Sequence, residues 1–186
     1  MGKLIVTEFI TADGVIEDPG QGGWAFKFNR GEDGDKFKYD ELMAADAQLL
    51  GRITYQGFAA AWPSMGTDDF GKKMNSMPKY VVSTTLTGAA ATWENSTVIS
   101  SDVAGEVTKL KKQVTGDILV AGSGNLIRTL GEHDLVDEYR LMTFPIVLGI
   151  GKRLFNDGFP RSDLRLVESK PVGPDGVVIL TYQPAR

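Results

Sequence analysis

Residues 103–131, VAGEVTKLKKQVTGDILVAGSGNLIRTLG, hold the pattern that decides the fold class. The apolar residues of the first part recur at i, i+4, i+7 and i+11, at Val103, Val107, Leu110 and Val114. Asp102 before this stretch and lysines near its end suit the two poles of a helix dipole, so we expect a helix over 103–114. The run 118–120 predicts a strand that ends at Gly122, and 126–131 predicts a second helix. This order is typical of an α/β protein.

The same alternation continues on both sides of this segment. Short, near-continuous apolar runs, typical of strands covered on both faces, predict further strands at 4–10, 47–50, 80–82, 97–99, 139–144 and 177–182. Amphipathic stretches at roughly 34–45 and 53–61 predict two more helices. We expect the second to end at Trp62-Pro63, because the residue before a proline avoids helical geometry.

After about residue 131 the chain has turn signals and no clear helical pattern. We therefore expect an α/β fold with a mixed, mostly parallel central sheet, helices on both faces and antiparallel C-terminal strands. With 186 residues, the chain is expected to form a single domain over 1–186, large enough to hold a core without disulfides or metals.

Composition excludes several classes of protein. The net charge is −4 and the Lys and Arg residues form no long block, which argues against a nucleic-acid or anionic-membrane partner. The chain has no cysteine and one histidine, so we expect no metal site, zinc ribbon or disulfide scaffold. No apolar run reaches the roughly 18 residues that a membrane span needs. We expect a cytoplasmic protein.

Glycine and hydroxyl residues follow three of the predicted strands. The candidate anion-binding positions are Gly51, Arg52, Ile53 and Thr54 after the first of these strands, Ser83 and Thr84 after the second, and Gly122, Ser123, Gly124, Asn125 and Leu126 after the third. Where such a turn opens onto a helix, backbone N–H groups and the helix dipole favour phosphate. Arg52 adds a planar fork of donors.

A structural alternative stays open for these turns, because a strand-to-helix connection often needs glycine for its geometry alone. The third segment also lacks the dinucleotide fingerprint Gly-x-Gly-x-x-Gly, since Ile127 stands where the last glycine would be.

Six segments match a known family in order and at similar spacing. They are Thr11-Ala12-Asp13-Gly14-Val15-Ile16, Leu50-Gly51-Arg52-Ile53-Thr54-Tyr55, Val81-Val82-Ser83, Leu119-Val120-Ala121-Gly122-Ser123-Gly124, Leu135-Val136-Asp137-Glu138-Tyr139-Arg140-Leu141 and Pro145-Ile146-Val147-Leu148-Gly149-Ile150-Gly151-Lys152-Arg153-Leu154-Phe155. Over nearly the whole chain they resemble the dihydrofolate reductase-like superfamily. The most similar branch comprises stand-alone proteins resembling the C-terminal reductase domain of the bifunctional riboflavin-biosynthesis deaminase/reductase.

The resemblance implies an NADPH-dependent reductase that is a homodimer and acts on a small-molecule substrate. It implies that the Gly-Arg-x-Thr turn and the later glycine turn hold the pyrophosphate, and that Arg52 with Ser83 or Thr84 meets the 2′-phosphate. Backbone around Ile16 and the Gly122-Ser123 peptide would border the nicotinamide.

Two further residues enter through the same resemblance. A gapless count back from the Gly-Arg turn places Asp35 at the substrate-binding carboxylate of dihydrofolate reductases, and Tyr39, one turn later, would line the same pocket. The alternative is a solvated acidic helix face. Asp13 is a turn residue or a catalyst, and Trp24 is either a lid over the substrate or part of the core.

The sequence also departs from the riboflavin-pathway reductases. Thr7 stands where they carry a lysine, and Thr11 replaces their serine. Because a phosphoribosyl substrate would lose that cation, we expect a different, less phosphorylated heterocycle (pterin- or aminouracil-like) or a carbonyl compound. Two alternatives are an NADPH-binding or ligand-sensing module without catalysis, and a flavin or deazaflavin carrier.

Overall fold

The computed structural model describes residues 1–20 and 23–185. Its elements are, in chain order, β1 (Leu4–Thr11), η1 (Ala25–Lys27), α1 (Gly31–Ala44), β2 (Ala45–Gly51), α2 (Arg52–Met65), α3 (Asp69–Ser76), β3 (Lys79–Val82), η2 (Gly88–Ala90), β4 (Ser96–Ile99), α4 (Val103–Gln113), β5 (Asp117–Val120), α5 (Gly124–Glu132), β6 (Glu138–Phe144), β7 (Leu164–Val172) and β8 (Val177–Pro184). Nearly all of the predicted elements are present within a few residues of their expected bounds.

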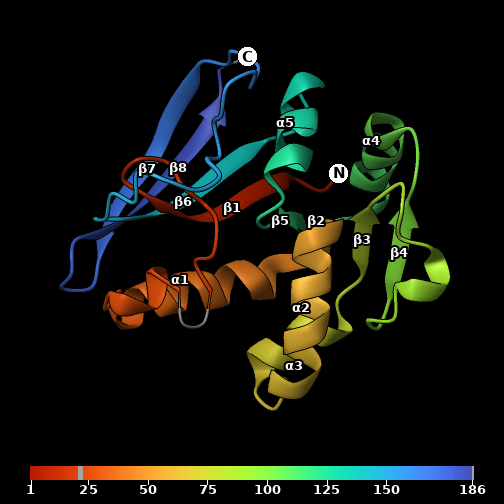
Figure 1. Cartoon of the computed structure of the whole chain (residues 1–186), viewed down its shortest axis with the longest axis horizontal. Coiled ribbons are helices and arrows are strands. Elements are labelled where there is room, and N and C mark those ends of the chain that lie inside the picture. The colour runs from red at the N-terminus through yellow and green to blue at the C-terminus, as the bar shows by residue number, and fades with distance from the viewer. Residues whose placement is uncertain (21–22, 186) are drawn as a thin grey trace.

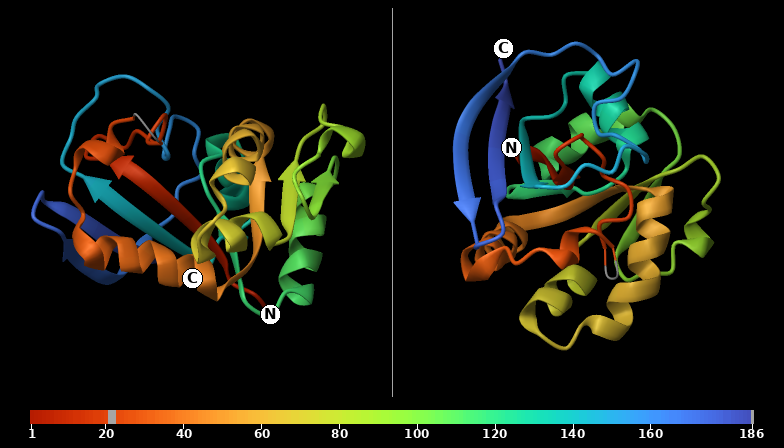
Figure 2. Two further views of the ribbon diagram at one scale, coloured as in Figure 1. Left: turned by 90° about the horizontal axis from the view of Figure 1, so that it is seen from below. Right: turned by 60° about the vertical axis from the view of Figure 1, so that its left-hand side comes forward.

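All of the strands join one sheet in the order β4-β3-β2-β5-β1-β6-β8-β7 (Figure 1). Strands β1 to β6 run parallel, whereas β8 is antiparallel to β6, and β7 is antiparallel to β8. Figure 2 shows this antiparallel pair at one end of the sheet and β3 with β4 at the other. The expected mostly parallel sheet with antiparallel C-terminal strands is confirmed.

Helices cover both faces of the sheet. On one face Val107 of α4 and Ile127 of α5 belong to the same core cluster as Val6 of β1, and all three are fully buried. On the other face Leu42 of α1 and Tyr55 of α2 belong to a second cluster, which α3 joins. Among the described residues, no helix is long and apolar enough to cross a membrane.

Helix α4 begins where its sequence signal predicts. The Asp102 carboxylate accepts a hydrogen bond from the Gly105 backbone N–H (3.2 Å) and so caps the helix. The backbone of Asp102 adopts the left-handed conformation, which aspartate tolerates better than most residues.

The predicted end of α2 at Trp62-Pro63 is wrong, because the helix continues to Met65 with Pro63 in its last turn. Packing against the next helix holds this turn: the Trp62 ring lies 5.6 Å from that of Phe70, and the Trp62 carbonyl accepts from Asn75 Nδ2 (3.1 Å). Tertiary contacts thus outweigh the local preference against helix before proline.

Two elements lacked a clear sequence signal. The eight residues of α3 include only two large apolar side chains besides the cap supplied by Asp68, which accepts from the Gly71 N–H (2.8 Å). Strand β7 is exposed along most of its length, so its sequence lacks the apolar run of a buried strand, and its pairing with β8 maintains it.

Candidate functional site

The first and third glycine turns meet in space at the carboxyl edge of the sheet. Strands β2 and β5 are neighbours, so Gly51 at the end of one lies beside the loop that follows the other. The Gly51 backbone N–H donates to Ser123 Oγ (2.8 Å), and Ser123 Oγ donates to Thr54 Oγ1 (3.1 Å). The two predicted cradles are therefore parts of one site.

The backbone conformation of the later turn explains its glycine. Gly122 has φ +56°, and a Cβ there would lie 2.7 Å from Thr54 Oγ1, so a larger residue could not fit without moving the first turn. Ser123 also adopts the left-handed conformation, with φ 66°, which costs a non-glycine residue about 1 kcal/mol or more. Its hydrogen bonds to the Gly51 turn hold it there.

The turn after β1 completes this site. Ile16 is buried, and a Cβ on Gly124 would lie 3.7 Å from its Cδ1. The Ile16 N–H donates to the Lys152 carbonyl (2.9 Å), which ties the turn to the segment after β6. Of the other residues predicted here, Asn125 is exposed, whereas Leu126 is buried in the core and offers the site only backbone.

Helix α2 presents its first residues to solvent at the same edge. Arg52 is exposed and its Nη1 donates to Gln56 Oε1 (3.1 Å), while the Ile53 side chain is 68% exposed. At the neighbouring end of β3, Ser83 Oγ accepts from the backbone N–H of Leu86 (2.9 Å), and Thr84 is exposed. The structure thus brings all three hydroxyl- and glycine-bearing strand ends to one edge.

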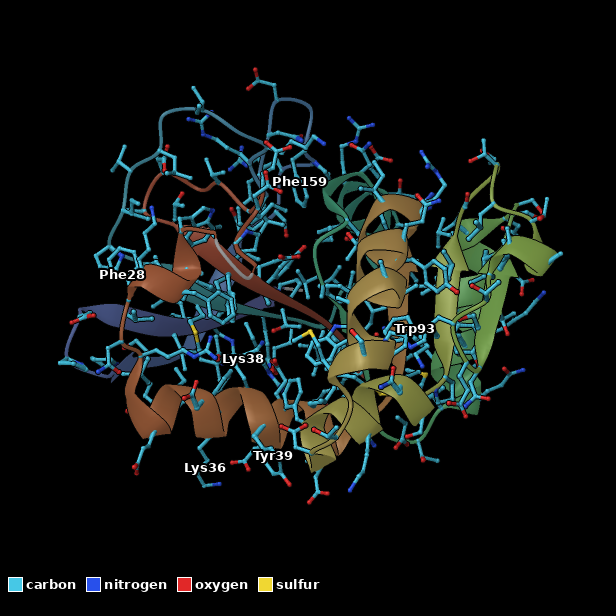
Figure 3. All side chains as sticks on the ribbon, turned by 60° about the horizontal axis from the view of Figure 1, so that its bottom comes forward. Phe28, Lys36, Lys38, Tyr39, Trp93 and Phe159 are labelled. Carbon is cyan, nitrogen blue, oxygen red and sulfur yellow. The ribbon has the colours of Figure 1, made fainter. Side chains whose placement is uncertain are left out.

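The structure does not bring Asp35 or Tyr39 to the site. The Asp35 side chain is 65% exposed and pairs with Arg30 Nε at 2.5 Å. Tyr39 is 41% exposed and points away from the sheet, as does Lys36, whereas Lys38 points toward it (Figure 3). The gapless count therefore selected the solvent-facing side of α1, which matches the alternative of a solvated acidic face.

Trp24 is part of the core in this structure. It is 6% exposed, and its ring meets the Phe144 ring edge to face at 5.4 Å. The indole Nε1 donates to the Glu17 carbonyl (2.8 Å), which satisfies its only polar group. These contacts favour the core interpretation over a lid.

Asp13 connects the turn after β1 to the segment after β6 through hydrogen bonds. It accepts hydrogen bonds from Thr11 Oγ1 (2.6 Å) and from the backbone N–H groups of Leu148 (3.2 Å) and Gly149 (2.9 Å), and it lies 3.5 Å from Arg153 Nη2. These bonds, above all that from Thr11, lower the pKa of Asp13 to about 2. The geometry supports a turn role.

The family model of the RibD C-terminal domain matches residues 2–178. The chain belongs to this family. It is 33% identical over 186 residues to YyaP, an uncharacterized protein of Bacillus subtilis (strain 168), and this match covers 97% of the chain and 94% of YyaP. A second uncharacterized protein of the same organism, YwjB, is 28% identical over 174 residues, which is 92% of each chain.

Solved structures share the fold of this RibD C-terminal domain. A putative riboflavin biosynthesis protein from Shewanella sp. PV-4 superposes with a TM-score of 0.77 at 23% identity, over 99% of both chains. Dihydrofolate reductase from Enterococcus faecalis, complexed with NADP(H), superposes with a TM-score of 0.62 at 15% identity, over 100% of this chain and 98% of the other. The expected dihydrofolate reductase-like fold is confirmed.

Sequence reasoning missed a buried polar cluster in this RibD C-terminal domain, formed by Thr7, Lys38 and Glu41. The Lys38 ammonium donates to Thr7 Oγ1 (2.6 Å) and to the Glu41 carboxylate, and Thr7 Oγ1 donates to Glu41 Oε2 (2.8 Å). Thr7 is the position at which the resemblance led us to expect the loss of a lysine, and the structure places the Lys38 ammonium of α1 beside it.

Glu8, the next residue of β1, points to the opposite face of the sheet and is also buried. Burial raises its pKa well above 4.5, while the Lys38 ammonium and the Gly122 backbone amide act in the opposite direction. One signal was available in the sequence: an acidic residue interrupts an otherwise apolar strand at 4–10.

A cavity of about 570 Å³ lies on the other side of the turn after β1. Thr11, Ala12 and Gly14 line it together with residues of β6, β8 and the segment before β7. Its lining does not include the Gly51 and Gly122 turns, so it is separate from the turns predicted to bind an anion.

Proposed function

We propose that this protein is an NADPH-dependent reductase that reduces a C=N or C=O bond of a small heterocyclic or carbonyl substrate. The observation that carries the proposal is the hydrogen bond from the Gly51 N–H to Ser123 Oγ, because it joins two glycine turns into one backbone-lined cradle. Such a cradle at the carboxyl edge of an α/β sheet is the usual place for a dinucleotide.

The residues present fit a dinucleotide phosphate. A Cβ on Gly122 would overlap Thr54, so the turn is open only as long as this residue is glycine. The first backbone N–H groups of α2 and α5 would bind the pyrophosphate, and the exposed Arg52 would pair with the 2′-phosphate. NADPH, when bound there, supplies a hydride.

Relatives support the same assignment. The fold is shared with a deaminase/5-amino-6-(5-phosphoribosylamino)uracil reductase from Thermotoga maritima, at a TM-score of 0.68 and 16% identity, of which this chain covers 57%. It is also shared with a dihydrofolate reductase that was solved with NADP(H). Family and fold together favour a reductase.

The buried cluster favours a substrate with little phosphate. The Lys38 ammonium lies beside Thr7, but it is already paired with Glu41. Arg140, the next cation, is paired with Glu138 and also contacts Glu41. Because both cations are already paired with buried acids, we expect an uncharged ring or carbonyl compound.

Calorimetric titration with NADPH and, separately, NADH tests the cofactor assignment. We expect tight binding of NADPH and weak binding of NADH, because only NADPH carries the phosphate that Arg52 would pair with. No binding of either cofactor would overturn the proposal. A screen for loss of reduced-cofactor absorbance with dihydrofolate, pterins, aminouracils and carbonyl compounds then tests the reaction.

A second candidate is a cofactor-binding module without catalysis. The solvent-facing position of Asp35 favours it, because the carboxylate expected to serve the substrate is absent from the site. Such a module would bind NADPH but would oxidise it with none of the compounds in the screen.

A further inference from the structure

Glu8 occupies an unusual position for an acid. It lies in the middle of β1 and is 4% exposed, on the strand face that Val6 and Ile10 bury in the core. Among the described residues, its Oε1 has no hydrogen-bond partner. A buried carboxyl oxygen without a hydrogen-bond partner lowers the stability of the folded protein. Packing alone therefore does not explain why an acid stands at this position.

The charges around Glu8 favour its neutral form on balance. Burial dominates and raises its pKa, and repulsion by Glu41 of α1 adds to this effect. Lys38 of α1 and the Gly122 amide lower the pKa, but Lys38 is also bonded to Glu41. From β6, Arg140 contacts Glu41 (Nη1 to Oε1, 3.5 Å), and the first turn of α5 carries no acidic residue.

Glu8 lies at the start of the cofactor cradle. The ladder between β1 and β5 ends at the pair Val6 and Val120, so Glu8 and Gly122 each lie two residues beyond the last pair of these neighbouring segments. The Gly122 amide is close enough to favour the Glu8 carboxylate. Gly122 is followed directly by Ser123, which holds Gly51. The buried acid and the phosphate cradle are therefore connected through one loop.

We propose that Glu8 holds the proton that the reduction consumes, and that the charge of the nicotinamide ring at the Gly122 turn controls its release. This inference rests on the proposed function. Reduction of C=N or C=O adds a hydride to carbon and a proton to nitrogen or oxygen. The proton leaves the Glu8 carboxyl group, which becomes a carboxylate and regains a proton from solvent after the oxidised cofactor leaves.

The charge of the nicotinamide ring determines when Glu8 releases its proton. A reduced nicotinamide ring is neutral and leaves Glu8 protonated, whereas an oxidised ring carries a positive charge. A positive charge close to a buried acid favours the carboxylate. By linkage, NADP⁺ binding should expel a proton from Glu8, and NADPH binding should not.

Calorimetry measures this proton release without any substrate. Binding of NADP⁺ and of NADPH is titrated at neutral pH in two buffers of different ionisation enthalpy, such as phosphate and Tris, so that the buffer dependence of the heat counts the protons released. The 2′-phosphate of the cofactor also titrates near this pH, but it is common to both cofactors and cancels in the difference. We expect NADP⁺ to release a large part of one proton more than NADPH.

The isosteric variant Glu8→Gln should abolish that difference while still binding both cofactors. Glu138→Gln is the matched control, because Glu138 is about as buried as Glu8 but lies at the amino end of the neighbouring strand β6, away from the Gly122 turn, and pairs with Arg140 (2.7 Å). It should retain the difference. If both cofactors bind and release the same number of protons, or if the difference persists in Glu8→Gln, the inference is wrong and the reductase assignment stands.

If the protein is not an NADPH-dependent reductase, the result is different: neither cofactor binds to the wild-type protein. The inference about Glu8 is then wrong as well. If Glu8→Gln does not fold, infrared difference spectroscopy of the wild-type protein decides. Exchange of NADPH for NADP⁺ should remove a protonated-carboxyl C=O band, and an unchanged band would overturn the inference.

Discussion

The hydroxyl of Ser123 accepts a hydrogen bond from the backbone N–H of Gly51 across 2.8 Å, although 72 positions separate the two residues in sequence. This bond exists because β2 and β5 lie side by side in the sheet. It brings the start of α2 and the start of α5 together, so that two helix N-termini lie at the same edge of the sheet. The proposed cofactor cradle therefore depends on a side chain, and not only on glycine turns.

Removal of the Ser123 hydroxyl should weaken NADPH binding. Ser123→Ala leaves the Gly51 N–H without its acceptor and deprives Thr54 of a donor, at a cost of about 1 kcal/mol or more, which corresponds to roughly five- to tenfold in affinity. Calorimetry with NADPH measures the change. Ser123→Gly tests the same hydroxyl without left-handed strain at this position, and it should bind NADPH as weakly as Ser123→Ala.

The exposed Ser101→Ala is the control and should bind like the wild-type protein. Wild-type affinity in Ser123→Gly would show that the hydroxyl serves the fold alone.

Arg52→Ala should weaken NADPH binding more than NADH binding. The substitution removes a charge-assisted contact to the 2′-phosphate, worth about 1.5 to 3 kcal/mol, so the NADPH dissociation constant should rise roughly ten- to a hundredfold. The exposed Arg161→Ala controls for the loss of one surface charge. Equal losses for both cofactors would place Arg52 away from the 2′-phosphate.

Local patterns were sufficient for most of the fold. Strands β2 and β5 run into glycine turns that open helices, and each of these transitions lies within about ten residues, so the sequence predicts them directly. The exposed strand β7 and the short helix α3 depend on neighbours that are distant in sequence or weakly apolar. Their stability comes from pairing and packing, which periodicity does not report.

The site was predicted less completely, for two physical reasons. The bond between Gly51 and Ser123 depends on strand order, which no local pattern contains. The choice of Asp35 depended on a residue count, which does not tell how α1 is rotated against the sheet. In the structure Asp35 is exposed, and the side chain that α1 directs to β1 is Lys38.

Asp13 should contribute to acid stability in a defined range of pH. Its pKa is lowered from 3.8 to about 2 in the folded protein, so its stabilising effect is complete above about pH 4 and is lost as the pH falls to about 2. Asp13→Asn should melt at a lower temperature than the wild-type protein at neutral pH, and the gap should narrow as the pH falls through this range.

Thermal melts followed by circular dichroism at several pH values measure this gap. Asp157→Asn, in an exposed turn, is the matched control and should show no such convergence. If the difference in melting temperature between Asp13→Asn and the wild-type protein stays constant from neutral pH to about pH 2, the Asp13 carboxylate does not stabilise the contact between the two loops.

The buried pair of Lys38 and Glu41 should matter far more to stability than the exposed pair one face away on the same helix. The side chains of Lys38 and Glu41 are 18% and 3% exposed. Lys38→Met removes the nearest cation from a buried carboxylate, leaves it only the more distant Arg140 (3.5 Å) and the Thr7 hydroxyl, and should cost about 3 kcal/mol. Lys36 and Asp40 are 71% and 56% exposed, and Lys36→Met should cost less than about 0.5 kcal/mol.

Urea unfolding measures the free energy of unfolding of Lys36→Met, of Lys38→Met and of the double variant Lys38→Met/Glu41→Gln. The double variant separates the cost of losing the Lys38–Glu41 pair from the cost of leaving the Glu41 carboxylate without Lys38. In the double variant the carboxylate is neutral, and Thr7 Oγ1 can still donate to the amide oxygen that replaces it, so most of the lost stability should return. Two outcomes would contradict this account: equal losses of stability in Lys36→Met and Lys38→Met, or a double variant no more stable than Lys38→Met. Either would mean that the Lys38 ammonium does not stabilise the buried Glu41 carboxylate.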